Sequence, residues 1–544
     1  MKRIFFLLLI SIFLTTCAPA PVSTLPTSTQ AVPSATSLPT ITPVTGNWWD
    51  NAVFYEIFVR SFSDSNGDGI CDFNGITKKL DYLKDLGINA IWLMPVHPSP
   101  TYHGYDVINY FNVNPDYGTM DDFKNLLTEA HKRDIHVIID LVLNHTSNQN
   151  PRFVDANNNP QSPYRNWYIW SDTDPGYSGP LGVAWHPGLH GFYYGIFGDN
   201  MPDLNYTDPA VTAEMDKVVH FWLDDVGIDG FRLDAVKYLI EEGQKQENTQ
   251  STHNWLKNFY TAYKADKTSA FTVGEVYGAG AFIAKTYTGN QMDEIFSFEL
   301  AGGFVNSTSG EANSGVDSAV QLTLKDMPGG PYATFLTNHD QNRVMSVLNG
   351  NIDKAKVAAS LLLTSPGTPF IYYGEEIGME GEKPDENIRL PMQWSSGANA
   401  GFTTGTPWEA VGTDYLQSNV AIESSDSNSL FSYYRNLLTL RSQHPALFEY
   451  GIKLISTNNP GVYSVIRYGQ NEKILIVINL TKTLISDYSL NLKDSSFQDG
   501  SYHLKSLLGS ETPLDLSVAG GSINAYVPLP GLTPYGTHIF IIEP

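Results

Sequence analysis

The sequence predicts an α/β protein: a (β/α)8 TIM barrel with a lobe inserted after its third strand and an antiparallel β-sandwich at its C-terminus. Three observations lead to this prediction. From Trp48 onward, short apolar runs alternate with amphipathic stretches, which is typical of βα units around a parallel sheet. One connection between apolar runs is much longer than the others. After Tyr450, apolar and polar residues alternate with the period of strands, as in Val462 to Ile466.

Eight apolar runs are the expected barrel strands. They lie near Val53 to Val59, Ala90 to Met94, Val137 to Leu141, Gly230 to Leu233, Phe271 to Gly274, Glu294 to Phe298, Thr334 to Leu336 and Pro369 to Tyr373. The third and fourth are separated by excess chain, about residues 146–205, with little helical periodicity. Because barrel active sites are built from the loops after the strands, this lobe is expected on the catalytic face. An amphipathic helix, Ser429 to His444, is expected near the end of the barrel domain (48–449), before the sandwich (450–544).

The N-terminus has the pattern of an export signal. Lys2-Arg3 precedes an apolar run, Ile4 to Leu14, that is too short for an ordinary transmembrane helix. Leu14-Thr15-Thr16-Cys17 resembles a bacterial lipobox, which implies that Cys17 is lipidated and holds the protein at a membrane surface. Thr16 departs from the usual small residue, so a secreted form stays open. Residues 18–47 have the composition of an uncharged Pro/Ser/Thr linker.

Composition narrows the class of partner. The chain has 544 residues and a formal charge of −24, which argues against a nucleic-acid partner because phosphate binding requires clustered Lys and Arg. Aromatic residues make up 12% of the chain and offer flat faces for stacking on sugar rings. Cys17 and Cys71 are the two cysteines, which excludes a disulfide framework. We expect Cys71 to be an inert, unpaired thiol and the protein to be a monomer.

Three acids follow apolar runs at their ends. The first run is Gly230 to Leu233, and Asp234 follows it. Arg232 and Asp234 share one face of this strand, so the guanidinium should hold the carboxylate ionised, as a nucleophile requires. Glu275 has no cation beside it in the sequence and is expected to stay protonated as an acid. Asp340 ends a third run. Each alone would be a solvated carboxylate past a strand, but together with His145 after a fourth run they predict one site.

Four motifs in order resemble the conserved regions of the α-amylase family, glycoside hydrolase family 13. They are Asp140 to His145, Gly230 to Asp234, Gly274-Glu275 and Asn338 to Asp340. The resemblance implies a retaining mechanism with Asp234 as nucleophile, Glu275 as acid and base, and Asp340 as the third acid. It also implies that the inserted lobe is the family's domain B. Substrate-binding roles fall on His103, Tyr105, His145, Arg232, Lys237 and His339.

The expected reaction is hydrolysis of internal α-1,4 bonds of starch and maltodextrins. Related exo-acting α-glucosidases carry an aspartate at the position of Tyr102. The absence of this aspartate favours an open cleft. Met201 to Asn205 resembles a form intermediate between oligo-1,6-glucosidases and neopullulanases, found among surface-anchored bacterial α-amylases. Exo-α-glucosidase, neopullulanase-like and transglycosylating activities therefore remain alternatives. An inactive surface glycan-binding protein on the same barrel is the alternative from another class.

One loop has the spacing of calcium ligands. Oxygen-bearing side chains stand at every second position, with glycines for the turn, which predicts a Ca²⁺ site from Asp64, Asn66, Asp68, the Ile70 carbonyl and Asp72. An EF-hand would have glutamate at the position of Gly75. An Asx-rich turn is the structural alternative. A second calcium beneath the lobe would involve Asn144.

Overall fold

The computed structural model describes residues 46–494 and 496–543. The chain divides into residues 1–45 and a compact unit from residue 46 on. The predicted signal, Cys17 and nearly all of the linker therefore lie outside the described residues. In the part of the chain that is described, no helix combines the length and apolarity that a membrane crossing requires.

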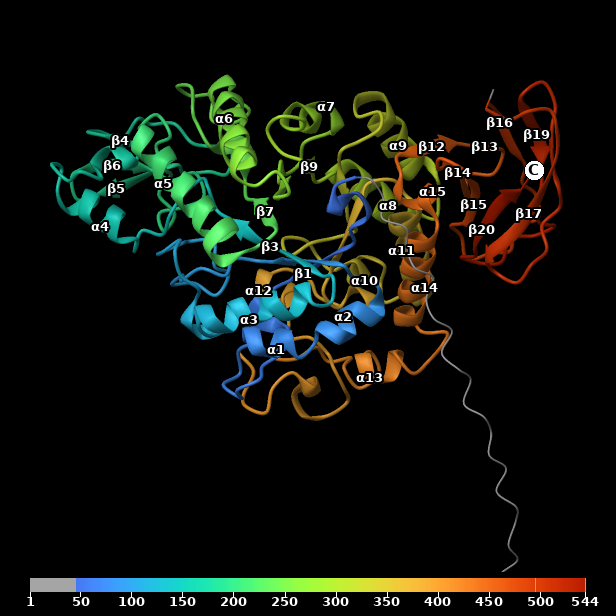
Figure 1. Cartoon of the computed structure of the whole chain (residues 1–544), viewed down its shortest axis with the longest axis horizontal. Helices are drawn as coiled ribbons and strands as arrows, with labels where there is room; N and C mark the ends of the chain where they lie inside the picture. Colours follow the sequence, from blue (N-terminus) through green and yellow to red (C-terminus); the bar gives the residue numbers. More distant parts are fainter. Residues whose placement is uncertain (1–45, 495, 544) are drawn as a thin grey trace, which may run out of the picture. The chain divides into compact units, whose positions relative to one another are not determined.

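The core of the unit is a parallel barrel, as predicted (Figure 1). Its strands stand in the order β10-β11-β1-β2-β3-β7-β8-β9, and a parallel bridge between Phe296 and Ala333 joins the two ends of this order. Their bounds are β1 Phe54–Ile57, β2 Ala90–Leu93, β3 His136–Leu141, β7 Gly230–Leu233, β8 Phe271–Gly274, β9 Glu294–Ile295, β10 Ala333–Thr334 and β11 Thr368–Tyr372. The sixth strand is shorter than predicted because Ser297 caps α8, its side chain accepting a hydrogen bond from Leu300 N.

Helices follow the barrel strands. They include α2 Leu80–Leu86, α3 Met120–His131, α5 Pro209–His220, α6 Gln250–Asp266, α8 Phe298–Gly310, α9 Ser314–Asp326, α11 Ile352–Thr364 and α14 Leu430–Gln443. The last of these is the amphipathic helix predicted before the sandwich, and the side chain of Ser429 caps its start.

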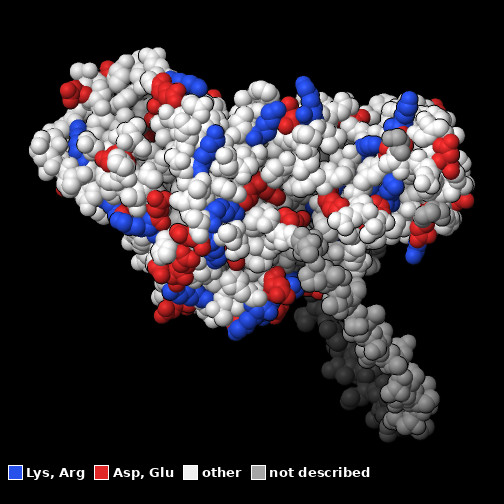
Figure 2. All heavy atoms as spheres, turned by 45° about the horizontal axis from the view of Figure 1, so that its top comes forward, with Lys and Arg blue, Asp and Glu red and all other residues white. Residues whose placement is uncertain are grey.

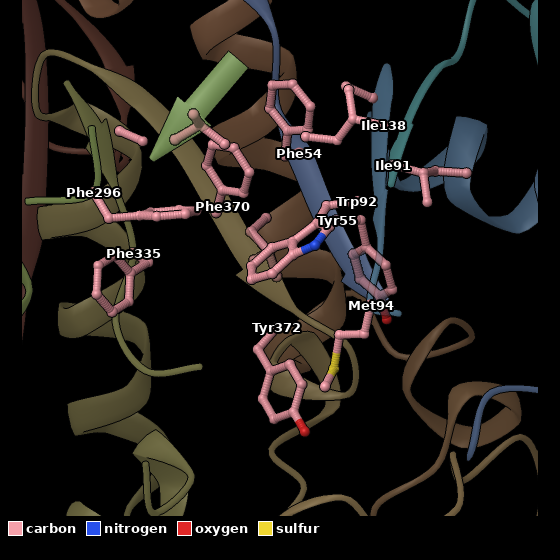
Figure 3. Close-up of a cluster of buried hydrophobic side chains, with 14 of the residues drawn as sticks. Phe54, Tyr55, Ile91, Trp92, Met94, Ile138, Phe296, Phe335, Phe370 and Tyr372 are labelled. Carbon is pink, nitrogen blue, oxygen red and sulfur yellow. The ribbon is translucent and has the colours of Figure 1, made fainter. Parts of the chain in front are cut away.

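Aromatic side chains fill much of the core (Figure 3). Phe54 and Phe370 stand opposite each other on β1 and β11, and their rings stack with centroids 4.3 Å apart. Trp92 on β2 contacts Phe296, at 5.6 Å, and also His339, at 5.5 Å. The aromatic core therefore supports the segment that carries Asp340.

The lobe inserted after β3 contains a small antiparallel sheet. Its strands are β4 Trp170–Ser171, β5 Trp185–Gly188 and β6 Gly191–Tyr194, in the order β4-β6-β5. The expectation of little helix here was incomplete, because α4 (Pro151–Asn158) precedes the sheet. Asn150 caps α4 and Pro151 occupies its first turn, a start signal that periodicity alone does not reveal.

Two antiparallel sheets form the C-terminal region. One has the order β12-β14-β15-β20-β17-β18 and the other β13-β16-β19. Their bounds are β12 Gly451–Leu454, β13 Ser456–Thr457, β14 Val462–Tyr468, β15 Lys473–Asn479, β16 Leu490–Lys493, β17 Gly500–Leu508, β18 Leu516–Val518, β19 Ser522–Tyr526 and β20 Thr537–Glu543. Arg467 of β14 donates a hydrogen bond to Thr364 O at the end of α11, which fastens the sheets to the barrel.

Candidate active site

Neighbouring parallel strands bring the predicted acids to one level. Asp140 on β3 stands opposite Arg232 on β7, and Leu233 stands opposite Gly274 on β8. Asp234 and Glu275 follow these last two residues directly. Because parallel strands end at the same edge, all of these side chains gather at the carboxyl end of the barrel.

Arg232 contacts all three carboxyl groups of a first charged cluster, Asp140, Asp234 and Glu275. Its side chain is 1% exposed, and Nη1 lies 3.0 Å from Asp140 Oδ1 and 2.5 Å from Asp234 Oδ1. Its Nη2 lies 2.8 Å from Glu275 Oε2. Burial raises the pKa of Asp140 to about 7, although the positive charge of Arg232 opposes this rise. One buried cation therefore orients three carboxyl groups.

The contact between Arg232 and Glu275 corrects the expectation that Glu275 has no cation beside it. The strand register brings Arg232 across from β7, so absence of a cation in the local sequence was the wrong criterion. Burial nevertheless raises the pKa of Glu275, and the charges of Asp234 and Asp340 raise it further against the effect of Arg232. Glu275 is thus biased toward its neutral form.

Asp340 lies in a second charged cluster. Its Oδ1 accepts a hydrogen bond from Arg389 Nη2 at 2.9 Å, and Oδ2 lies 3.3 Å from His339 Nε2. Burial favours the neutral carboxyl, but the positive charges of His339 and Arg389 outweigh it and lower the pKa of Asp340. His339 Nδ1 lies 2.5 Å from Glu56 Oε1. Burial lowers the pKa of His339, but the negative charges of Asp340 and Glu56 outweigh burial and raise this pKa overall.

Tyr105 joins the two clusters. Its hydroxyl donates to Asp140 Oδ2, at 3.1 Å, and lies 2.7 Å from His339 Nε2. His145 Nε2 lies 3.1 Å from Tyr105 O, and Tyr105 N donates to His103 Nδ1 at 3.1 Å. Burial lowers the pKa of His145 to about 4, so this imidazole is neutral at pH 7.

These groups line a cleft of about 410 Å³. Its lining includes all three predicted catalytic acids and the predicted binding residues His103, Tyr105, His145 and Lys237. Arg232 and His339 are buried beneath the lining residues. A carboxyl group paired with a buried guanidinium, a second whose pKa is raised by burial, and a third acid around one cleft are the groups that glycosidic bond cleavage requires.

Comparison with known proteins identifies this arrangement. The family model described as "Alpha amylase, catalytic domain" matches residues 56–451. The chain belongs to the α-amylase family, glycoside hydrolase family 13. It is 42% identical over 441 residues to "Alpha-amylase 3" of Dictyoglomus thermophilum, covering 80% of this chain and 86% of that protein. It is 35% identical over 514 residues to an oligo-1,6-glucosidase of Parageobacillus thermoglucosidasius, covering 80% and 91%.

Solved structures agree with this assignment. The crystal structure of an α-amylase from H. orenii superposes with a TM-score of 0.79 at 36% identity, covering 90% of this chain and 99% of that one. The trehalulose synthase MutB from Pseudomonas mesoacidophila MX-45 superposes with a TM-score of 0.78 at 30% identity, covering 92% and 100%. The chain is a glycoside hydrolase, which argues against the alternative of an inactive surface glycan-binding protein on the same barrel. Its relatives within the family differ in substrate.

Two residues that the family motifs predicted have unforeseen partners. Lys237 lies in the cleft wall, and its Nζ is 2.8 Å from Glu247 Oε2, so it is not a free surface lysine. Tyr102 stacks on Trp408 with ring centroids 5.4 Å apart. An aromatic pair therefore stands near the Arg389 side of the cleft, with the Arg389 guanidinium 5.9 Å from the Tyr102 ring.

Sequence reasoning missed Glu56, Arg389 and Tyr277. Glu56 is 2% exposed within the apolar strand β1, and a lone acid inside an apolar run was the available signal. Arg389 contacts both Asp340 and Asp385 through Nη2, at 2.9 and 3.0 Å. Tyr277 follows Glu275 by two residues and lines the cleft while 52% exposed. An exposed aromatic residue just after a catalytic motif was the signal in that case.

The predicted calcium loop has the donor chemistry for the ion, and two of its carboxylates accept hydrogen bonds from backbone amides. Asp64 accepts hydrogen bonds from Gly67 N and Gly69 N, and Asp72 accepts from Gly75 N at the start of α1 (Phe73–Thr77). Among the described residues, the one trio of His, Cys, Asp or Glu with ligand atoms all within 4.8 Å lies elsewhere. All donors in the loop are oxygens, which suits a hard cation such as Ca²⁺. Cys71 is buried, and burial raises the pKa of its thiol, in agreement with an inert residue.

Asn144, the residue suggested for a second calcium, is buried beside the inserted lobe. Its Nδ2 donates to Asp203 Oδ2 at 3.0 Å, and its Oδ1 has no hydrogen-bond partner in the described part of the chain. A second calcium at this point stays a prediction.

Proposed function

We propose that the protein is a retaining α-amylase that hydrolyses internal α-1,4 bonds of starch and maltodextrins. The observation that carries this proposal is the sharing of one guanidinium by Asp234 and Glu275. Two carboxyl groups paired with the same guanidinium are held near each other, which supports the separation of about 5 Å that a retaining mechanism requires.

The chemistry proceeds in two displacements. Asp234 attacks the anomeric carbon while Glu275 donates its proton to the glycosidic oxygen, which leaves with the cleaved chain. Glu275, now a carboxylate, then takes a proton from water as the water oxygen attacks the same carbon and releases Asp234. Asp340, held anionic by Arg389 and His339, accepts hydrogen bonds from sugar hydroxyls.

Endo cleavage is supported by the absence of an acid at position 102. Tyr102 and Trp408 stack on each other near Arg389, and this aromatic pair would carry a glucan chain past the cleavage point. On the molecular face drawn in Figure 2, Lys and Arg side chains are scattered rather than gathered, which suits a neutral polymer.

An exo-acting α-glucosidase is the second candidate. The contacts of Arg389 with Asp340 and Asp385 place a charged network in the lining of the cleft, where it would close a pocket behind a terminal sugar. A time course with soluble starch and with a chain blocked at its non-reducing end separates the two. Mixed oligosaccharides from the blocked chain establish endo cleavage. Glucose from open chains, with the blocked chain untouched, establishes the exo enzyme.

Two further proposals concern residues outside the cleft. Ca²⁺ bound by Asp64, Asn66, Asp68, Ile70 O and Asp72 would stabilise the folded barrel, and the oxygen donors of this loop support it. Export and lipidation at Cys17 would place the enzyme at the cell surface, and the apolar run before Cys17 supports this. Cys17→Ser should release the enzyme from the membrane fraction; continued membrane association would refute the anchor.

A further inference from the structure

A second cavity lies between the inserted lobe and the loop that follows β7. Its volume is about 550 Å³, larger than that of the active-site cleft. Residues 239–241 and 243 line it, while Ala235, Lys237 and Tyr238 line the cleft. One loop therefore forms a wall of both cavities. A small buried cluster that contains Tyr194 and Tyr238 packs at this wall.

Aromatic rings form one side of the second cavity. Trp185 on β5 contacts Tyr194 on β6 edge to face, with ring centroids 5.3 Å apart, and contacts Tyr177 in the same manner at 6.0 Å. All three line the cavity, as do Tyr168, Trp170 and Tyr206. Faces and edges of this kind bind the apolar faces of pyranose rings.

Three polar atoms of the lining have no hydrogen-bond partner among the described residues. They are Tyr194 OH, Trp185 Nε1 and Glu241 Oε1. Tyr194 is only 1% exposed, so its hydroxyl is withdrawn from bulk solvent. An unpaired polar group at such a depth costs about 1–3 kcal/mol, so a small adjustment of the wall that let a ligand hydroxyl pair with it would recover that free energy.

The charges of the lining select a neutral ligand. Asp172 and Glu241 are acidic, and Arg165 is the basic member. Arg165 already donates to Ala156 O and His190 O and stacks on Trp170. An anion therefore meets no available cation. The indole N–H of Trp185 cannot be a metal ligand, so a metal ion held by Glu241 would leave this donor unpaired. Hydroxyl groups, which both donate and accept, match all three unpaired atoms.

We propose that this cavity is a second α-glucan site, binding a maltooligosaccharide segment beside the active-site cleft. The proposal rests on the α-glucan substrate of the proposed function. Because loop 235–243 borders both cavities, a chain held in the second one raises the effective concentration of substrate at the first. The benefit is confined to long or insoluble glucans.

Calorimetric titration with maltoheptaose tests the proposal. The whole chain carrying Asp234→Asn, which does not consume the sugar, should bind two molecules. Adding Tyr177→Ala and Trp185→Phe should leave one. Tyr194→Phe removes a single hydroxyl and should weaken the second site by about 2–10-fold. Phe282→Ala is the matched control, because Phe282 is 63% exposed and lines neither cavity.

Activity provides the second readout, in chains that retain Asp234. The Tyr177→Ala, Trp185→Phe chain should hydrolyse p-nitrophenyl α-maltoside normally but insoluble starch about tenfold more slowly. A single maltoheptaose site in the parent, equal loss on both substrates, or a second site that takes up Ca²⁺ and no sugar would overturn the proposal. Failure of wild-type protein to cleave starch would refute the proposed function instead, because the titration does not depend on turnover.

Discussion

Arg232 Nη2 lies 2.8 Å from Glu275 Oε2, so the residue assigned as acid shares a cation with the residue assigned as nucleophile. Ala235 N also donates to Glu275 Oε2, at 3.2 Å. With Oε2 accepting a hydrogen bond from Ala235 N and paired with the guanidinium, the proton of the neutral acid belongs on Oε1. The guanidinium therefore orients Glu275 without preventing its protonation, because burial and neighbouring acids raise its pKa.

Replacing the nucleophile should stop turnover without unfolding the protein. Asp234→Asn preserves the shape of the side chain but removes the attacking carboxylate, and activity on starch should fall by more than about a thousandfold. Starch binding and the melting temperature should be close to those of the wild type. Near-normal turnover in a sample free of wild-type enzyme would refute the assigned role.

Replacing the acid should affect substrates according to their leaving groups. In Glu275→Gln, a sugar leaving group can no longer receive a proton, so starch hydrolysis should be lost. A glycosyl fluoride needs no such proton and should still react in the first step, detected as a burst of fluoride. Equal loss on both substrates would show that Glu275 does not act as the acid.

The pH profile should report the same proton. Since the acid must be protonated, kcat/KM should fall as pH rises through the pKa of Glu275, and this limb should lie above the ordinary glutamate value because the pKa is raised. Its position is measured on maltoheptaose. With a glycosyl fluoride as substrate the high-pH limb of the first step should disappear.

The three acids are predictable from sequence because each ends an apolar run and a parallel barrel brings all strand ends to one face. Glu56 and His339 are 283 residues apart, so their contact depends on the closed ring and leaves no local pattern. The Arg232–Glu275 contact likewise depends on which strands are neighbours. The cavity around Trp185 is lined by loops and by strands β4 to β6 of the lobe, and strands of two to four residues are too short to show a strand period.

Calcium removal should lower the melting temperature. An ion bound only to the folded state adds about 2.7 kcal/mol at a hundredfold excess over its dissociation constant. Chelation of the wild type should therefore shift the transition down by a few degrees, and added Ca²⁺ should restore it. Asp64→Ala should melt at the lower temperature and show no response to either treatment. An unchanged curve for verified metal-free wild type would refute the site.

Asp229 should stabilise the barrel most strongly in mildly acidic solution. Its Oδ2 accepts from Val137 N and contacts His131 Nε2, both at 2.8 Å, and Oδ1 lies 3.2 Å from His136 Nδ1. Burial raises the pKa of Asp229, but the contacts with His131 and His136 outweigh it and lower the pKa overall. The hydrogen bond with Asp229 in turn raises the pKa of His131.

The signs of these shifts define the pH window. A lowered aspartate pKa stabilises the fold above about pH 4, the unfolded value, and a raised histidine pKa stabilises it below about pH 6.5. Asp229→Asn should therefore cost about 1–3 kcal/mol of unfolding free energy, with the largest loss between these values. Denaturant titrations at pH 3, 5.5 and 8.5 measure it. Asp224→Asn, which breaks the exposed pair with His220, is the control and should change stability by less than about 0.5 kcal/mol. A loss that is equal at all three pH values would mean that Asp229 acts through its hydrogen bond to Val137 alone.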